Sequence, residues 1–361
     1  EYRRQRQMCI RDRLSVMDSI SEKHVRDSRI QGTIIAILCA GTLASAIIAI
    51  GLGSSSTLDP ISTIKIILGL EEGSDLQTVI IWELRFPRVL MAIIGGAALG
   101  TAGALMQGCL GSPLVSPLTL GVASGSALGA AFSIILGFSV ISEVSVVAIA
   151  FLFSLAVVAI ITKLGNMRSV SSESYILVGI AITFISGAIV STFTYFATGA
   201  QLSQLANWSY GSLSRPSLTE VIWVSAAIIC LMPSAMKWAW DLNTLSLGGD
   251  DFAISSGVNP SSTRRNILIL SALMTSLVIA FTGLIGFVGL AAPHMGRLVI
   301  GNDYRKLIPC SAVLGSLLML FADTAGRTLF TPVIIPVGMI MAIIGGPLFV
   351  YLLLRNREVA I

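Results

Sequence analysis

Charged residues are scarce in this sequence, and histidine is almost absent. Only 12% of its 361 residues are Asp, Glu, Lys or Arg, and it has two histidines, whereas a soluble domain usually has about 25% charged residues. The chain therefore has few residues that could form a catalytic pair or a metal centre, which disfavours a membrane-embedded enzyme. The five cysteines follow no metal-ligand spacing and are interpreted as small apolar side chains: Cys9, Cys39, Cys109, Cys230 and Cys310.

A phosphate-binding loop of the form G-x-x-x-x-G-K-[ST] is also missing from the sequence. ATP hydrolysis, if the function requires it, must come from another polypeptide, and ATP with Mg²⁺ would bind there. The net charge of +4 is informative through the positions of the positive residues, not as a sign of nucleic-acid binding. We expect no cofactor and no nucleic acid on this chain.

Apolar residues, in contrast, make up 54% of the chain and occur in runs near the roughly 20 residues that cross a bilayer as a helix. Because backbone groups in lipid must satisfy one another, such runs favour helices over the alternating strands of a barrel. The sequence predicts an all-α polytopic membrane protein with about ten spans, near residues 31–53, 86–108, 116–137, 143–164, 174–198, 218–237, 264–284, 287–300, 307–327 and 336–355.

The third and eighth of these spans are short and rich in glycine. Short or interrupted segments at corresponding places in two halves are typical of inverted repeats in transporters. The ranges 86–198 and 264–355 each hold four spans, and ten spans would give these two halves opposite orientations. We therefore expect an inverted internal repeat.

Lys and Arg indicate the orientation. With the amino terminus inside, 18 of the 23 lie on the inner side, or 13 against 5 without residues 1–13. This bias is the one expected of cytoplasmic loops, so both termini are predicted to be cytoplasmic and the protein to lie in the cytoplasmic (inner) membrane. The expected organisation is a cytoplasmic arm at 1–30, one permease domain at 31–356 and a cytoplasmic tail at 357–361. Within the arm, residues 1–13 resemble a non-native leader, and Met17 resembles a native start.

Two loops between the spans are long. The outer one, 54–83, is predicted to be a solvated cap with a short helix. The inner one, 238–263, contains Asp250 and Asp251 where carboxylates would favour the start of a short helix, and Gly257 where a helix-capping glycine belongs. A capped helix on this side would suit the docking of a partner.

Several motifs resemble the permease subunits of binding-protein-dependent ABC importers for iron siderophores, haem and cobalamin. They occur in the family's order across roughly residues 30–356: LRFPRVL at 84–90, GGAALGTAGALMQ at 95–107, SPLVSPLTLGV at 112–122, GLIGFVGLAAPHMGR at 283–297, ADTAGR at 322–327 and PVGMIMAIIGGPLF at 336–349. The resemblance implies a pore of two permease copies, two cytoplasmic ATPase subunits, an extracytoplasmic substrate-binding protein and transport by alternating access. The choice among the cargoes stays open.

The resemblance also implies roles for individual residues. The run GDDFAISSGV at 249–258 resembles the family's ATPase-coupling segment, although Ser256 stands where a larger apolar residue is usual. Its candidate coupling residues are Gly249, Asp250, Asp251, Ala253, Gly257 and Val258. Candidate gate residues of the pore are Ser112, Leu114, Ser171 and Ser172, with Ser112 where Asn is common. An ordinary capped loop helix and plain polar loop residues are the alternative interpretations.

The family's docking arginines correspond to Arg85, Arg88 and Arg327, where arginine can form bidentate contacts with carboxylates of a binding protein. Alternatively, these side chains anchor helix ends at headgroup level. Asp323 lies within an apolar span and four residues before Arg327, a spacing that permits an ion pair on one helix face. Such a pair would orient a docking arginine. An ion-coupled secondary transporter is the alternative function, and it would be expected to need several such carboxylates.

Overall fold

The computed structural model describes the chain except residues 1, 53–59, 68, 139–142, 166–171 and 359–361, and the described part is helical without strands. The elements, in chain order, are α1 (Tyr2–Gly51), α2 (Pro60–Ile67), α3 (Asp75–Val79), the π-helix η1 (Ile80–Arg85), α4 (Phe86–Leu110), α5 (Val122–Ile135), α6 (Glu143–Gly165), α7 (Ser172–Phe196), α8 (Gly199–Ser209), α9 (Leu218–Lys237), α10 (Ala239–Ser255), α11 (Pro260–Thr282), α12 (Val288–Ile300), α13 (Tyr304–Thr328) and α14 (Val337–Glu358).

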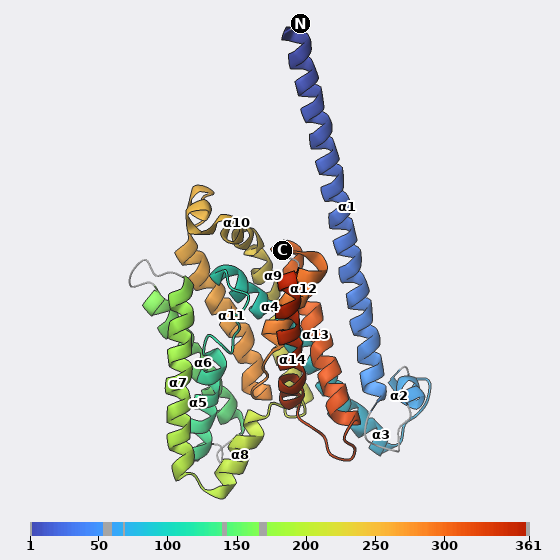
Figure 1. Ribbon diagram of the computed structural model, residues 1–361. Helices are drawn as coiled ribbons and strands as arrows, with labels where there is room; N and C mark the ends of the chain where they lie inside the picture. Colours follow the sequence, from blue (N-terminus) through green and yellow to red (C-terminus); the bar gives the residue numbers. More distant parts are fainter. Residues whose placement is uncertain (1, 53–59, 68, 139–142, 166–171, 359–361) are drawn as a thin grey trace.

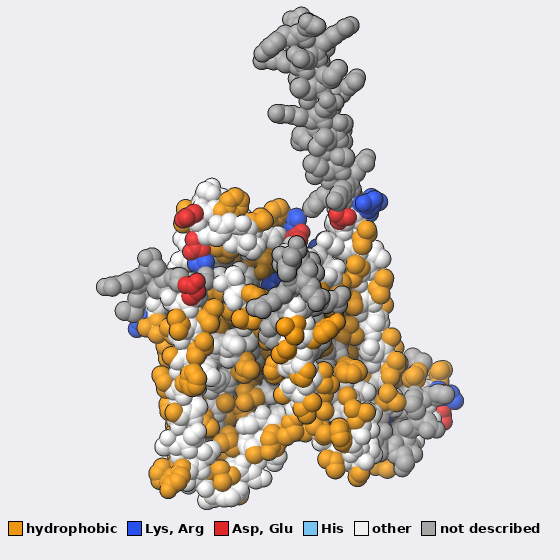
Figure 2. Space-filling view, viewed as in Figure 1, with side chains coloured by type: hydrophobic (Ala, Val, Ile, Leu, Met, Phe, Trp, Pro, Cys, Tyr) orange, Lys and Arg blue, Asp and Glu red, His pale blue; other side chains and the backbone are white. Residues whose placement is uncertain are grey.

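The predicted polytopic all-α fold is confirmed. In the described residues, seven helices are long and apolar enough to cross a membrane, and three shorter apolar helices lie at 122–135, 288–300 and 337–347. The helices form one bundle, with α10 at one end and α2, α3 and α8 at the other, while α1 extends far beyond the bundle on the α10 side (Figure 1). Charged side chains gather near α10, and apolar side chains cover most of the bundle below (Figure 2).

Two segments near predicted spans differ from the sequence-based prediction. The third span begins as a helix at Val122 and not at residue 116, because Pro113 and Pro117 lack the amide hydrogens that a helix needs and residues up to Gly121 form turns. Helix α8, in the stretch between the fifth and sixth spans, was not predicted. Its signal is the capping box at Thr198 and Gln201, in which each side chain binds the other residue's backbone amide.

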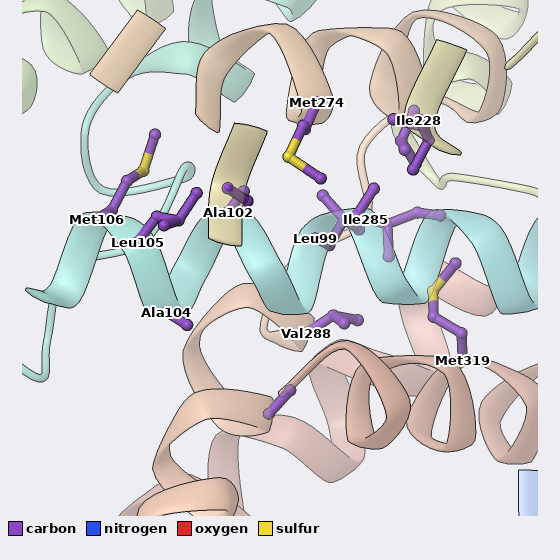
Figure 3. Packing of buried hydrophobic residues seen from close by; sticks show 14 of the residues in the cluster. Leu99, Ala102, Ala104, Leu105, Met106, Ile228, Met274, Ile285, Val288 and Met319 are labelled. Atoms are coloured by element: carbon purple, nitrogen blue, oxygen red, sulfur yellow. The ribbon is translucent and has the colours of Figure 1, made fainter. Parts of the chain in front are cut away.

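Helix α4 forms the centre of the bundle, and its buried face extends along nearly its whole length. Figure 3 shows Leu99 and Ala102 of α4 among Met274 of α11, Val288 of α12 and Met319 of α13. Small residues allow these backbones to approach closely: a Cβ atom on Gly96 would overlap the carbonyl oxygen of Gly315. The same holds for Gly100 against Ser311 and for Gly103 against Gly289.

Candidate functional site

Four charged side chains meet at the end of the bundle away from α10. Arg85 belongs to η1, Arg88 to the first turn of α4, and Asp323 and Arg327 to α13. Asp323 Oδ1 accepts a hydrogen bond of 2.6 Å from Arg88 Nε, and Asp323 Oδ2 lies 3.0 Å from Arg327 Nε in the i, i+4 ion pair that the spacing predicted. Each of the three arginines is only 5% exposed and Asp323 is 1% exposed. We call these four residues the arginine cluster.

The arginine cluster also holds the carboxyl end of α1. Arg85 Nη1 donates to the carbonyl oxygens of Ile50 and Gly51 at 2.8 and 3.0 Å. Arg327 donates to those of Ala49 and Leu52 at 2.9 and 3.0 Å. The last carbonyls of a helix have no partner within it, and cations there also favour the negative end of the helix dipole. The arginines therefore fasten α1 to α4 and α13.

These contacts place the three candidate docking arginines together but do not test their predicted docking role. Sequence reasoning found the cluster's members from motifs and found the Asp323–Arg327 pair from its local spacing. It missed the α1 carbonyls, because backbone atoms carry no sequence signal.

The candidate coupling segment begins where α10 breaks. Gly249 has φ 70° and ψ −159° inside the helix, a conformation that only glycine adopts easily, so Asp250 and Asp251 start a second helical piece as predicted. The preceding piece, Ala239–Gly248, was not predicted. At the other end Gly257 has φ 83°, and its amide and that of Val258 bind the carbonyls of Ile254 and Ala253 at 3.0 and 2.9 Å. This hydrogen-bond pattern is the predicted glycine cap.

One predicted coupling residue, Asp250, is exposed but is held by an ion pair. Arg264, in the first part of α11, donates to both carboxylate oxygens of Asp250 at 2.8 and 2.5 Å, and its Nε donates to the carbonyl of Cys109 at 2.9 Å. Arg264 thus joins the second piece of α10 to the end of α4. Ala253 is buried, whereas Asp251 is exposed, as are the apolar side chains of Leu247, Phe252 and Ile254. The coupling segment therefore presents Phe252 and Ile254 to the exterior, next to Leu247 of the preceding helical piece, while the Asp250–Arg264 pair fixes it to α11.

The first piece of α10 is fixed by residues that the sequence analysis missed. Asn243 donates to Asp303 at 2.8 Å and accepts from the amide of Tyr304 at 2.9 Å, and Arg305 lies over the ring of Trp240 at 4.6 Å. Burial raises the pKa of Asp303, but hydrogen bonds from Arg305 and Asn243 outweigh this effect and lower the pKa below its ordinary value. The sequence feature that could have pointed to these contacts is Asp303, because aspartate is a common capping residue just before a helix.

The candidate gate residues are only partly described. Ser112 is half-buried and Leu114 is exposed, both in the turns between α4 and α5. Ser172 is the first residue of α7, and Ser171 lies outside the described residues. Their predicted gating role therefore stays a prediction.

Comparison with known proteins shows a consistent likeness. The model of the FecCD transport family matches residues 41–355. The hemin transport system permease protein of Yersinia pestis is 39% identical over 282 residues, 77% of this chain and 84% of the relative. The cobalamin import system permease protein of Halobacterium salinarum is 35% identical over 283 residues, 78% of this chain and 74% of the relative.

A solved structure is similar as well. It is described as a metal-chelate type ABC transporter in an inward-facing conformation, and it superposes with a TM-score of 0.78 at 27% identity, covering 90% of this chain and 99% of the other.

Proposed function

The chain belongs to the FecCD transport family, and from this premise we propose how it works as the membrane-spanning permease subunit of an ABC importer for an iron chelate, haem or vitamin B12. Two copies of the chain form the translocation path, which opens alternately to each side of the cytoplasmic membrane. Two separate ATPase subunits bind the α10 end, which is cytoplasmic together with both termini. An extracytoplasmic binding protein delivers the cargo to the opposite end.

The coupling segment carries this proposal. Its exposed Phe252 and Ile254, together with Leu247 just before it, suit a groove on another protein, because burial of apolar side chains away from water is favourable. The Asp250–Arg264 pair connects that surface to α4, the most buried helix of the bundle. Movement of an ATPase subunit would therefore reach the centre of the bundle through residues that are already in contact.

The test is reconstitution of the chain in vesicles with a candidate ATPase and binding protein, followed by measurement of ATP hydrolysis. We expect loaded binding protein to stimulate hydrolysis and cargo uptake together. Uptake driven by an ion gradient without any ATPase would refute the proposal in favour of the secondary transporter. The structure offers that alternative little support: Asp323 is the one buried carboxylate among the described residues, and it is held between two arginines.

Replacing Asp250 with asparagine should uncouple the ATPase from transport. The change leaves the nearly buried Arg264 without its carboxylate and frees the second piece of α10 from α4. We expect the cargo imported per ATP hydrolysed to fall about tenfold, because charge-assisted bidentate contacts are worth roughly twice a neutral hydrogen bond. The control is Glu72→Gln, an exposed carboxylate between α2 and α3 and outside the coupling segment. Equal ratios in both variants would contradict the coupling role of Asp250.

We further propose that the arginine cluster attracts acidic residues of the binding protein. Three arginines and one aspartate give the cluster a net charge of +2, and a charge in a low-dielectric site projects a field beyond its own surface. The association rate of binding protein with permease should therefore fall about tenfold between low and physiological salt, measured by surface plasmon resonance on permease in nanodiscs. A rate independent of salt would count against this docking mode.

A further inference from the structure

A groove of about 490 Å³ opens on the surface of the bundle between α6 and α11. Helix α6 lines it from Leu155 to Lys163, and α11 adds Ile269 and Leu273. Thr162 in this lining donates its hydroxyl hydrogen to the carbonyl one turn earlier at 2.8 Å, so it has no hydrogen left for a ligand. Beyond Lys163, which lies at one end, the wall is therefore apolar. We call this feature the α6–α11 groove.

Two cationic side chains lie at the end of the groove nearest to α10. Lys163 is in the last turn of α6. Arg265 precedes Ile269 by four residues and is exposed like it, so it continues the same stripe of α11 by one turn. The two helices run in opposite directions, because α6 ends and α11 begins at the α10 end of the bundle (Figure 1). Lys163 and Arg265 therefore flank the same end of the groove.

Both cations are exposed and available to an anion. Neither of them forms an ion pair within the part of the chain that the structure describes. The carboxylate of Asp250 is taken by the adjacent Arg264, and Arg265 has a long contact of 3.5 Å with the side chain of Asn266. The end of the groove therefore carries two positive charges that no described carboxylate pairs with.

The length and the charge of the groove together indicate its occupant. Leu155 and Lys163 are eight residues apart, or about 12 Å along a helix axis, which fits within one half of a hydrocarbon core about 30 Å thick. Long cationic side chains at helix ends reach towards lipid headgroups, and cationic sites between transmembrane helices bind anionic headgroups. We propose that the α6–α11 groove binds an anionic phospholipid, with its phosphate at Lys163 and Arg265 and one acyl chain along the apolar wall.

The bound lipid would lie next to the coupling segment. Arg265 follows Arg264, whose ion pair with Asp250 joins that segment to α11, so a phosphate at Arg265 would hold the start of α11 in place. The assignment of this lipid to the cytoplasmic leaflet rests on the proposed function, which places the α10 end in the cytoplasm. The binding itself does not, because the phosphate and the acyl chain meet the same residues in either orientation of the chain.

The test is native mass spectrometry of the purified full chain, titrated with dioleoyl phosphatidylglycerol or with zwitterionic dioleoyl phosphatidylcholine, which has the same acyl chains. We expect phosphatidylglycerol to bind about tenfold more tightly, because its headgroup keeps a net negative charge. Lys163→Gln and Arg265→Gln should each weaken its binding about fivefold, the usual effect of one cationic residue near an anionic headgroup. Lys163→Arg keeps the charge and should bind as the parent does.

A variant that fills the groove separates a specific site from general attraction to surface charge. Ala159 lines the groove and is exposed, so Ala159→Trp covers the apolar wall, keeps both cations and leaves the buried packing of the bundle alone. It should weaken phosphatidylglycerol binding about tenfold, as if about two methylene groups of the acyl chain lost their contacts. The matched control is Ala40→Trp at an exposed position of α1, which should leave the binding unchanged.

Equal affinity for the two lipids would overturn the proposal, and so would binding that neither the loss of a cation nor Ala159→Trp weakens. The same spectra report the oligomeric state of the chain. Dimers that dissociate in Ala159→Trp would show that a second copy of the chain covers the groove, which would also overturn the proposal. Failure of the importer proposal would appear separately, in the ATP hydrolysis assay, which uses vesicles of one fixed lipid composition.

Discussion

Replacing Asp323 with asparagine is expected to destabilise the protein by about 3–5 kcal/mol, the usual cost of removing one partner of a buried ion pair. The carboxylate contacts both Arg88 and Arg327 and is 1% exposed. Its loss leaves Arg88 and Arg327, two buried guanidinium groups, without the carboxylate that they share. The measurement is the thermal unfolding midpoint of the purified protein in detergent, with equilibrium unfolding where it is reversible.

A double substitution shows whether the loss of stability comes from the unpaired charge. Asp323→Asn combined with Arg88→Gln removes one charge of each sign, so the double variant should be more stable than the sum of the two single losses. Glu72→Gln, an exposed carboxylate, serves as the control and should change the midpoint little. Additive losses in the double variant would mean that the two side chains do not interact as described.

Replacing Gly103 with alanine is expected to be the most damaging of the small substitutions in α4. The added Cβ atom would overlap the carbonyl oxygen of Gly289 on α12, and a backbone atom cannot move away as the tip of a side chain can. Overpacking usually costs about 1–3 kcal/mol and sometimes more. Since α4 also contacts α9, α11 and α13, a displacement at Gly103 would disturb several interfaces, and we expect a lower unfolding midpoint and less folded protein in the membrane.

The matched control is Gly41→Ala in α1, where no heavy atom lies within 4 Å of the added Cβ atom. Alanine also favours the helix more than glycine does, so this variant should be as stable as the parent or slightly more stable. A similar fall of the unfolding midpoint in both variants would show that Gly103 is not required for the close approach of α4 and α12. Unfolding midpoints of the two variants, measured in the same detergent, decide the question.

The sequence by itself determined the apolar helices of the bundle and where most of them lie, although not α8 or the first piece of α10. The sixth span, predicted at 218–237, is α9 at Leu218–Lys237, and the third and eighth spans are short, at 14 and 13 residues. The Asp323–Arg327 pair and the Gly257 cap were also predictable. All these features depend on residues within one segment: its solvation by lipid, the i, i+4 spacing on one helix face, or the backbone freedom of one glycine.

The tertiary structure alone decided which segments meet. Arg327 binds the carbonyl oxygens of Leu52, just after α1, and of Ala49, within α1, which lie 275 and 278 residues away in sequence. The Gly103 backbone lies against Gly289 on another helix. No local pattern encodes such contacts, because the partner is a backbone atom and every residue has one. Only the combined packing of the helices around α4 selects the partner.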